Sequence, residues 1–342
     1  MRMRLAIAAL VLLVGAIGAP NAADGPYQLI KEVQIGGDGG WDYLNIDGAA
    51  KRLYISHASK VVVYDLATDK VIGEIADTPG VHGAVIGPNG HIFTSNGREN
   101  KASMVDGKTF QTIAKIDTEG NPDFIMYEPK RKEIYTMNGT GKSATVINAD
   151  GKVIATIPLG GKPEAGVSDP AADRVYINNE TASTIVVVDA TKHEVVANWP
   201  IAPGATQAGL AIDVKNHRLF VGARNSLMVM MDSTNGTVLA QVPIGAGVDA
   251  TVFDPVTGYA MSSSGGDGTT TIAKGDSSGK LTIVQSLKTA RGARTMALDP
   301  ATHRIYLAAA KYQDPAPDAP ANARPVMVPG SMHVLVYGID GK

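Results

Sequence analysis

The chain has 342 residues, a formal net charge of −2 and no cysteine. A charge so close to neutrality gives no overall electrostatic basis for binding nucleic acid or an anionic membrane. The absence of cysteine excludes disulfides, thiolate metal sites and covalently attached c-type haem. Glycine is abundant, at 38 residues, and so much glycine with few long helical patterns indicates many turns.

The first 23 residues form a separate segment. The opening MRMR is basic, residues 5–18 are apolar, and small residues end the segment near Ala22 or Ala23. The apolar run is shorter than the ~20 residues that span a bilayer. This pattern predicts a cleaved secretory signal peptide and hence a periplasmic or secreted protein, with an uncleaved membrane anchor as the alternative. Residues 24–342 are expected to form a single domain.

Beyond this segment one unit recurs along the chain. It is seen by comparing DGAAKRLYISHASKVVVYD from Asp47, DPAADRVYINNETASTIVVVD from Asp169 and DPATHRIYLAAA from Asp299. Its aromatic residue recurs about every 42 residues, with Ala260 in the remaining place, at Tyr54, Phe93, Tyr135, Tyr176, Phe220 and Tyr306. Each copy supplies four short β-rich runs. Seven copies predict an all-β fold, a seven-bladed β-propeller with four-stranded antiparallel blades.

The two ends of the repeat fit together. The last copy reaches MHVLVYG and lacks its fourth run, whereas YQLIKEVQIGG, residues 27–37, is a fourth run with no earlier partners. We therefore expect the N-terminal strand to complete the last blade. This arrangement seals the ring and removes an exposed sheet edge.

The repeated pattern DP…RxYVxN…VxVxD…VVxxIPVG resembles the YVTN-repeat family of seven-bladed propellers, the group that includes YncE. The resemblance covers nearly all of the chain after the first segment. It implies an exported bacterial protein; most such relatives have no assigned reaction, and some are linked to DNA binding or to quinoprotein-dependent metabolism. The motif is specific for the fold and weak for chemistry.

One set of residues stands five positions before the turn that follows the first strand of each blade. Its members are Asp42, His82, Asp123, Glu164, Ala208, Asp249 and Arg294. Because the innermost strands of a propeller line its central channel, these side chains are expected to meet at one opening.

Four carboxylates at one opening repel each other unless something neutralises them. Arg294 can pair with one or two of them. The others either hydrogen-bond to backbone and channel water or hold a cation. Oxygen ligands of this kind suit Ca²⁺ or Mg²⁺. The predicted ligands are Asp42, Asp123, Glu164 and Asp249.

A second set lies three residues after the aromatic of each blade. It includes His57, Asn96, Asn138 and Asn179, with Arg98, Glu180 and Arg224 just beyond. The loops that follow these strands open on the same face as the first set, so both sets are expected to surround one funnel. The asparagines equally suit turns, and a purely local role is the alternative. The two arginines would add donors for anions.

A long proline-rich loop, residues 311–332, replaces the short loop of other copies. It is expected on the funnel face, either as a lid over the opening or as a surface insertion. The methionines of LMVMMD are expected in the core.

These patterns leave three functions open. The leading interpretation is an exported binding or scaffold protein of the cell envelope, expected to be a monomer, that uses the funnel for a small ligand, a peptide or an envelope protein. The alternative is a metal-assisted hydrolase or lyase of the propeller lactonase type, with His57 or His82 transferring protons. No H-E-x-x-H motif is present, and neither a nucleophile elbow nor a redox cofactor site is indicated.

Single-stranded DNA binding is the third function, carried by the family resemblance. It requires a basic track with stacking aromatics. The arginines available for it are Arg98, Arg224, Arg291, Arg294 and Arg324. The neighbouring carboxylates argue against entry of phosphates into the channel.

Overall fold

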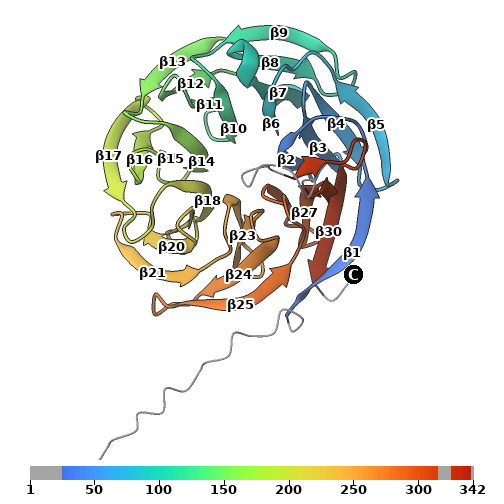
Figure 1. Cartoon of the computed structure of the whole chain (residues 1–342). Helices are drawn as coiled ribbons and strands as arrows, with labels where there is room; N and C mark the ends of the chain where they lie inside the picture. The colour runs from blue at the N-terminus through green and yellow to red at the C-terminus, as the bar shows by residue number, and fades with distance from the viewer. Residues whose placement is uncertain (1–24, 315–324, 340–342) are drawn as a thin grey trace, which may run out of the picture.

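The computed structural model describes residues 25–314 and 325–339, which form a ring of seven four-stranded antiparallel sheets around a central axis (Figure 1). The predicted segment 1–23 lies outside the described residues. No helix in the described part of the chain is long and apolar enough to cross a membrane.

The first four blades follow the chain, each running from the innermost strand outward. Blade 1 is β2 (Trp41–Asp47), β3 (Arg52–His57), β4 (Lys60–Asp65) and β5 (Lys70–Ile75). Blade 2 is β6 (Val81–Ile86), η1 (Pro88–Gly90), β7 (His91–Asn96), η2 (Gly97–Glu99), β8 (Lys101–Asp106) and β9 (Thr112–Asp117). Blade 3 is β10 (Pro122–Glu128), β11 (Glu133–Asn138), β12 (Ser143–Ile147) and β13 (Val153–Pro158). Blade 4 is β14 (Pro163–Asp169), β15 (Arg174–Asn179), β16 (Thr184–Asp189) and β17 (Glu194–Pro200).

The remaining blades include the one that joins the two ends of the chain. Blade 5 is β18 (Gln207–Asp213), β19 (Arg218–Ala223), β20 (Leu227–Asp232) and β21 (Val238–Pro243). Blade 6 is β22 (Val248–Asp254), β23 (Tyr259–Ser264), β24 (Thr269–Gly275) and β25 (Leu281–Lys288). Blade 7 is β26 (Met296–Asp299), β27 (Arg304–Ala309), β30 (His333–Ile339) and β1 (Tyr27–Gln34). Two further short strands, β28 (Tyr312–Gln313) and β29 (Val326–Met327), pair with each other.

The core lies between the blades. Seven apolar clusters fill the seven interfaces between neighbouring blades, and each cluster draws side chains from two of them. The repeated aromatics are buried there, as are Met228, Met230 and Met231 of the predicted core. Because every interface has its own cluster, no gap remains in the ring, and burial of apolar surface holds the blades side by side.

The repeated acids at the ends of the strands cap turns. Asp254 at the end of β22 accepts hydrogen bonds from the backbone N–H groups of Val256 and Thr257, and Asp189 at the end of β16 caps a turn in the same way. A short side chain that accepts from the backbone two or three residues later is a standard turn device. These acids, although the most regular in the sequence, therefore shape turns.

The predicted closure of the ring is confirmed, because β1 pairs antiparallel with β30 as the outermost strand of blade 7. The side chain of Gln285 in blade 6 supports this strand. Its Oε1 accepts from the N–H of Tyr27 at 2.9 Å, and its Nε2 donates to the carbonyl of Tyr27 at 2.9 Å. The N-terminal strand is thus bound to two blades.

Replacing Gln285 by alanine is expected to lower the free energy of unfolding by about 1–3 kcal/mol, because it leaves the buried N–H and C=O of Tyr27 without partners. Urea denaturation measures the change. Gln28→Ala on the exposed side of β1 is the matched control and is expected to shift stability by less than about 0.5 kcal/mol. Equal effects of the two substitutions would show that the clamp does not stabilise the closing strand.

Candidate functional site

A β-bulge at the start of the innermost strand aims one side chain at the axis in six of the seven blades. One extra residue interrupts the pairing of the first two strands in each. These positions hold Asp42, His82, Asp123, Glu164, Ala208 and Asp249, and in blade 7 Arg294 precedes β26. A bulge leaves a residue unpaired and redirects its side chain. The repeat position found in the sequence is therefore a bulge position.

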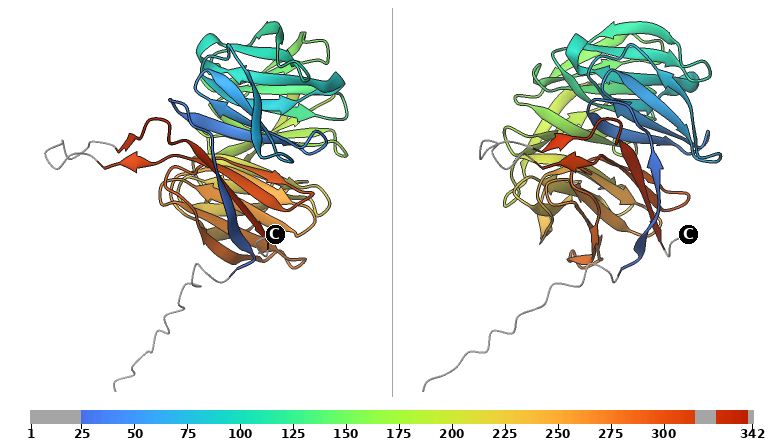
Figure 2. Two further views of the ribbon diagram at one scale, coloured as in Figure 1. Left: turned by 90° about the vertical axis from the view of Figure 1, so that its right-hand side faces the viewer. Right: turned by 45° about the vertical axis from the view of Figure 1, so that its right-hand side comes forward.

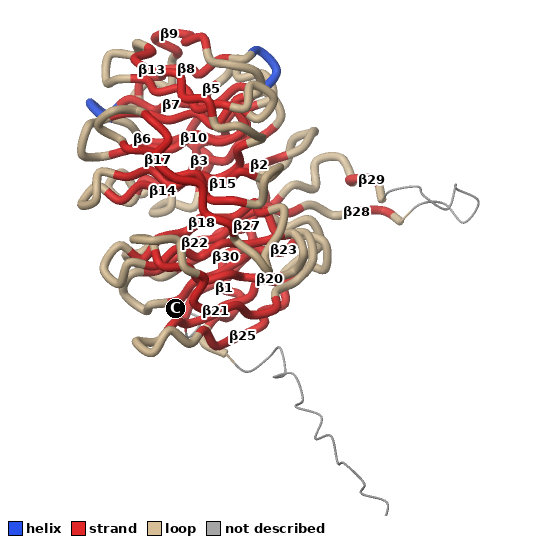
Figure 3. The backbone as a smooth tube through the Cα atoms, turned by 90° about the vertical axis from the view of Figure 1, so that its left-hand side faces the viewer, coloured by secondary structure: helices blue, strands red, loops and turns tan. Residues whose placement is uncertain are grey.

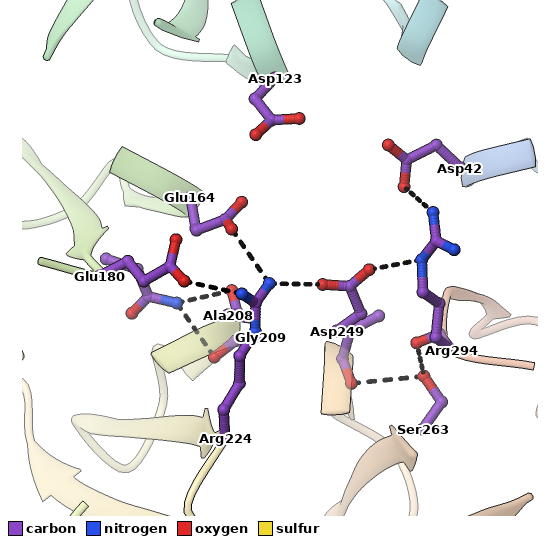
Figure 4. Close-up of polar contacts among 12 residues, drawn as sticks. Asp42, Asp123, Glu164, Glu180, Ala208, Gly209, Arg224, Asp249, Ser263 and Arg294 are labelled. Carbon is purple, nitrogen blue, oxygen red and sulfur yellow. Dashed lines mark hydrogen bonds and ion pairs between the residues drawn. The ribbon is translucent and has the colours of Figure 1, made fainter. Parts of the chain in front are cut away.

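Side chains from all seven blades form a closed ring of ion pairs, in which acids and bases alternate. We call these eight residues the charged ring. In order around the axis, the N–O distances are Asp42–His82 2.6 Å, His82–Asp123 3.0 Å, Asp123–Lys162 3.9 Å, Lys162–Glu164 2.9 Å, Glu164–Arg224 3.1 Å, Arg224–Asp249 3.2 Å, Asp249–Arg294 2.8 Å and Arg294–Asp42 3.6 Å. Figure 4 shows the part of the ring around Arg224 and Arg294.

Arg224 fills the place that Ala208 leaves empty in blade 5. It follows β19 rather than heading β18, and its guanidinium reaches Glu164, Asp249 and Glu180 (Figure 4). Lys162, just before β14, binds Glu164 and Glu180. Lys162 lies two residues before the repeat position, so the repeat does not predict it as a funnel residue. The carboxylates are therefore neutralised largely by cations of the chain itself.

The charged ring surrounds an open hollow of about 430 Å³, which we call the funnel. Tyr43, Gly247 and Val248 complete its lining. This volume lies within the range of small-molecule sites. Two links of the ring, Arg294–Asp42 at 3.6 Å and Lys162–Asp123 at 3.9 Å, exceed hydrogen-bond length. The ring is therefore open to an inserted water or ligand group on either side of the Asp42–His82–Asp123 segment.

His82 lies between two carboxylates, and its Nδ1 faces both Asp42 and Asp123. Burial opposes the imidazolium, but the hydrogen bonds and charges of Asp123 and Asp42 outweigh it and raise the pKa of His82 to about 10. Burial raises the pKa of Asp42, although His82 and Arg294 oppose the shift. Burial also opposes ionisation of Asp123, but His82, Lys162 and Arg224 outweigh it and lower its pKa. His82 is thus a cation at neutral pH.

On the opposite side of the charged ring, Glu164 and Glu180 share two cationic partners, Lys162 and Arg224. Burial, together with the negative charge of Asp123, raises the pKa of Glu164 to about 8. Glu180 is more exposed, and its bonds to Lys162 and the charge of Arg224 lower its pKa. The more buried acid of the pair therefore holds its proton to a higher pH than the more exposed one.

Tyr43 lines the funnel, and its ring contacts that of Phe124, which lines the adjoining apolar cavity. Tyr43 and Phe124 occupy positions where the other innermost strands carry small residues such as Gly83 and Ala250, and their rings meet edge to face at 4.9 Å. Tyr43 also lines a mainly apolar cavity of about 140 Å³ further along the axis. Burial, with the charges of Asp249 and the other ring acids, raises the pKa of Tyr43 well above its usual value. Tyr43 therefore presents a neutral phenol to the funnel, and the repeat does not predict it because only two of the seven strands carry a bulky residue there.

The predicted metal ligands are only partly brought together. Within the described residues, one group could hold a metal ion, namely Asp42, His82 and Asp123, whose ligand atoms lie within 4.8 Å of one another. Glu164 and Asp249 instead bind Arg224. Because this group mixes oxygen and nitrogen ligands, it suits a transition metal or zinc better than Ca²⁺ or Mg²⁺.

Four buried members of the second predicted set do not line the funnel, and the expectation is corrected for them, whereas Arg224 of that set does line it. Asn96 bonds to Glu99 and Ser103, Asn138 bonds to Ser143 and Thr145, and Asn179 bonds to the carbonyl of Leu159. The ring nitrogens of His57 face the carbonyls of Gly40 and Gly36. The ends of these strands are covered by their own loops, so the side chains support the loops around the funnel.

The five arginines of the DNA-binding hypothesis have different surroundings. Arg98 and Arg291 are exposed, and neither lines the funnel. Arg224 and Arg294 are held by carboxylates. Arg324 lies outside the described residues. A phosphate entering the funnel would have to displace those carboxylates from the two arginines.

The described part of the proline-rich loop is a short hairpin, β28 and β29, that projects from one face of the ring (Figures 2 and 3). Its base borders the funnel, because Tyr312 and Met327 line a hollow that also includes Trp41 and Arg294. Residues 315–324 of the loop lie outside the described residues. The described hairpin therefore adds apolar surface beside the charged ring.

Fold and site together define a seven-bladed β-propeller with a charged axial funnel. No family model and no curated protein matches the sequence. Among solved structures, the fold is similar to that of "Kuenenia stuttgartiensis Hydrazine Synthase", with a TM-score of 0.70, 17% identity and coverage of 85% of this chain and 95% of that one. It is also similar to a chain of "Crystal Structure of Mitotic Checkpoint Complex", with a TM-score of 0.73, 12% identity and coverage of 98% and 99%. Likenesses at this level of identity show the propeller fold alone.

Proposed function

We propose that this protein is an exported binding protein of the YVTN-repeat, YncE-like kind, which holds a small zwitterionic molecule in its axial funnel. The observation that carries the proposal is the charged ring, in which acids and bases alternate around an open hollow of about 430 Å³. A molecule with one cationic and one anionic group matches such a ring. Its cationic group can bind an acid of the ring while its anionic group binds the neighbouring base.

The exposure of the ring supports binding over a purely structural role. Asp42, Asp123 and Asp249 keep about 15–16% of their side-chain surface exposed, and Arg294 keeps 42%. A buried ion pair is often no more stabilising than apolar residues of similar volume. Charges that face an open hollow are instead available to a ligand.

Export forms the second part of the proposal, and rests on the sequence of residues 1–23. The basic start, the apolar run and the small residues near Ala22 and Ala23 are those of a cleaved secretory signal. A periplasmic or secreted location gives the funnel access to small molecules outside the cytoplasm, or to an envelope protein for which the propeller acts as a scaffold.

The test uses the full chain, expressed with its N-terminal segment and collected from the periplasm. Native mass spectrometry with elemental analysis identifies what it retains, and NMR then follows the His82 imidazole during titration with glycine, acetate or methylammonium. Glycine is expected to perturb His82 more than either singly charged probe. No retained molecule and no response to glycine would overturn the proposed function. An Asp42→Asn, Arg294→Gln variant is expected to lose the response.

Metal-assisted hydrolase or lyase activity remains the second candidate, favoured by the spacing of Asp42, His82 and Asp123. These residues would hold a divalent ion that acidifies a water molecule or polarises a carbonyl. His82 would then be a ligand and His57 is covered by its loop, so neither is free as a separate proton-transfer group. Stoichiometric metal in the same elemental analysis, lost in Asp123→Ala, would favour this candidate over the binding protein.

A further inference from the structure

A second hollow adjoins the funnel and shares Arg294 with it. We call this hollow, of about 300 Å³, the annex. It is lined by Gly39, Gly40, Trp41, Arg294, Tyr312 and Met327. Its walls are aromatic, thioether and glycine backbone, in contrast to the charges of the funnel.

Resting on the proposed function, we propose that the annex selects the ligand class: a zwitterion that carries an aromatic or other bulky apolar side group, such as an aromatic amino acid. The charged groups occupy the ring at Asp42 and Arg294, and the side group enters the annex between Tyr312 and Met327.

Arg294 connects the two hollows geometrically. Its Nε donates to Asp249 at 2.8 Å and one Nη donates to the carbonyl of Trp41 at 3.1 Å. The same Nη lies 3.6 Å from Asp42 Oδ1, beyond hydrogen-bond length, so this link is open. The other Nη makes no hydrogen bond or ion pair with residues 25–314 and 325–339. A ligand carboxylate can therefore bind Arg294 while the adjacent ammonium binds Asp42, without breaking a short ion pair.

The neighbourhood of Asp42 places a side group in the annex. Trp41 precedes Asp42 in β2 and lines the annex, while Asp42 lines the funnel. Tyr312, from the hairpin, is 38% exposed. Exposed tyrosines with an apolar face are typical of binding surfaces. Methionine opposite it adapts to ligand shape and favours contact with aromatic rings.

The indole of Trp41 gives an independent observation. Trp41 is only 6% exposed, and its Nε1 has no hydrogen-bond partner in the described part of the chain. Buried donors are usually satisfied by protein, water or ligand. The indole is therefore a polar group in a residue of the annex wall that the described residues leave unsatisfied.

The test compares four probes on the full chain by isothermal titration calorimetry: L-phenylalanine, glycine, 3-phenylpropionate and phenethylamine. L-phenylalanine is expected to bind at least about tenfold more tightly than glycine, from burial of its ring. It is also expected to bind more tightly than the two probes that lack one charge. The Tyr312→Ala, Met327→Ala variant is expected to remove the advantage over glycine and leave glycine binding unchanged.

The outcomes separate the two proposals. Glycine and L-phenylalanine of equal affinity, or a preference for phenylalanine that survives the double substitution, would overturn the annex and leave the funnel as the ligand site. If phenethylamine or 3-phenylpropionate bound as tightly as phenylalanine, the proposal that the site requires both charges of a zwitterion would also be overturned. Failure of all four probes would overturn the proposed function itself. Tyr312→Phe is the conservative control and is expected to keep the preference.

Discussion

The Arg224→Met variant is expected to lose about 2–3 kcal/mol of unfolding free energy. Arg224 is the only side chain of blade 5 in the charged ring, and its removal leaves Glu164 and Asp249 without their shared partner. Glu164 has only 6% of its side chain exposed. Removing one partner of a buried ion pair costs about 3–5 kcal/mol, and the partial exposure of Arg224 reduces this cost.

Urea denaturation at neutral pH measures the loss, with Arg98→Met as the matched control. Arg98 occupies the corresponding loop of blade 2, is exposed, and forms no ion pair within the described residues. Its replacement is expected to change stability by less than about 0.5 kcal/mol. Adding Glu164→Gln to Arg224→Met is expected to restore part of the loss, because it removes a buried carboxylate that would then share only Lys162 with Glu180. If both methionine variants were equally stable, the ring would not join blade 5 to its neighbours.

The second large effect is a loss of stability between pH 7 and pH 9.5, on the order of 3 kcal/mol. The pKa of His82 is about 10 in the folded chain against 6.5 for a free histidine. A group whose folded pKa is raised stabilises the fold fully below its unfolded pKa, and this contribution is lost as pH rises through the folded value. Each unit of pKa difference corresponds to about 1.4 kcal/mol.

Glu164 acts in the same direction at lower pH. Its pKa rises from 4.5 to about 8, so its contribution is complete below pH 4.5 and is lost as pH rises through 8. Urea midpoints at several pH values measure the combined slope. His82→Asn is expected to flatten the slope above pH 8, whereas His217→Asn, on an exposed turn, is expected to leave it unchanged. Parallel profiles for the parent protein and both variants would contradict the stabilisation of the His82 imidazolium by Asp42 and Asp123. An imidazole NMR signal showing neutral His82 at pH 8 would contradict it as well.

The sequence predicted the fold and most of the charged ring for a common reason, repetition. The period of the aromatic residues specifies the blades, and the same period locates Asp42, His82, Asp123 and Asp249 at one level of the axis. What the alignment could not show is the bulge that turns these side chains inward, because a bulge is a property of strand pairing.

Two members of the charged ring stand outside the repeat position, and some residues that follow the repeat do not reach the funnel. Lys162 enters the ring from outside the repeat position, and Arg224 reaches across from the next strand to replace Ala208. The asparagines Asn138 and Asn179 do follow the period, but they repeat because each blade needs its own loop supported. Equal spacing thus identifies equivalent positions, and side-chain length and loop cover decide which of them reach the funnel.

Pairing of the first described strand with the last also determines when the molecule can finish folding. Blade 7 needs β1 together with β26, β27 and β30, so a chain in which β30 is not yet available cannot assemble it. Bringing together segments about 300 residues apart costs roughly 5 kcal/mol of chain entropy. That cost is met only when blades 1 and 6 are available to pack on both sides. The circular architecture therefore resists completion until β1 and β30 can pair.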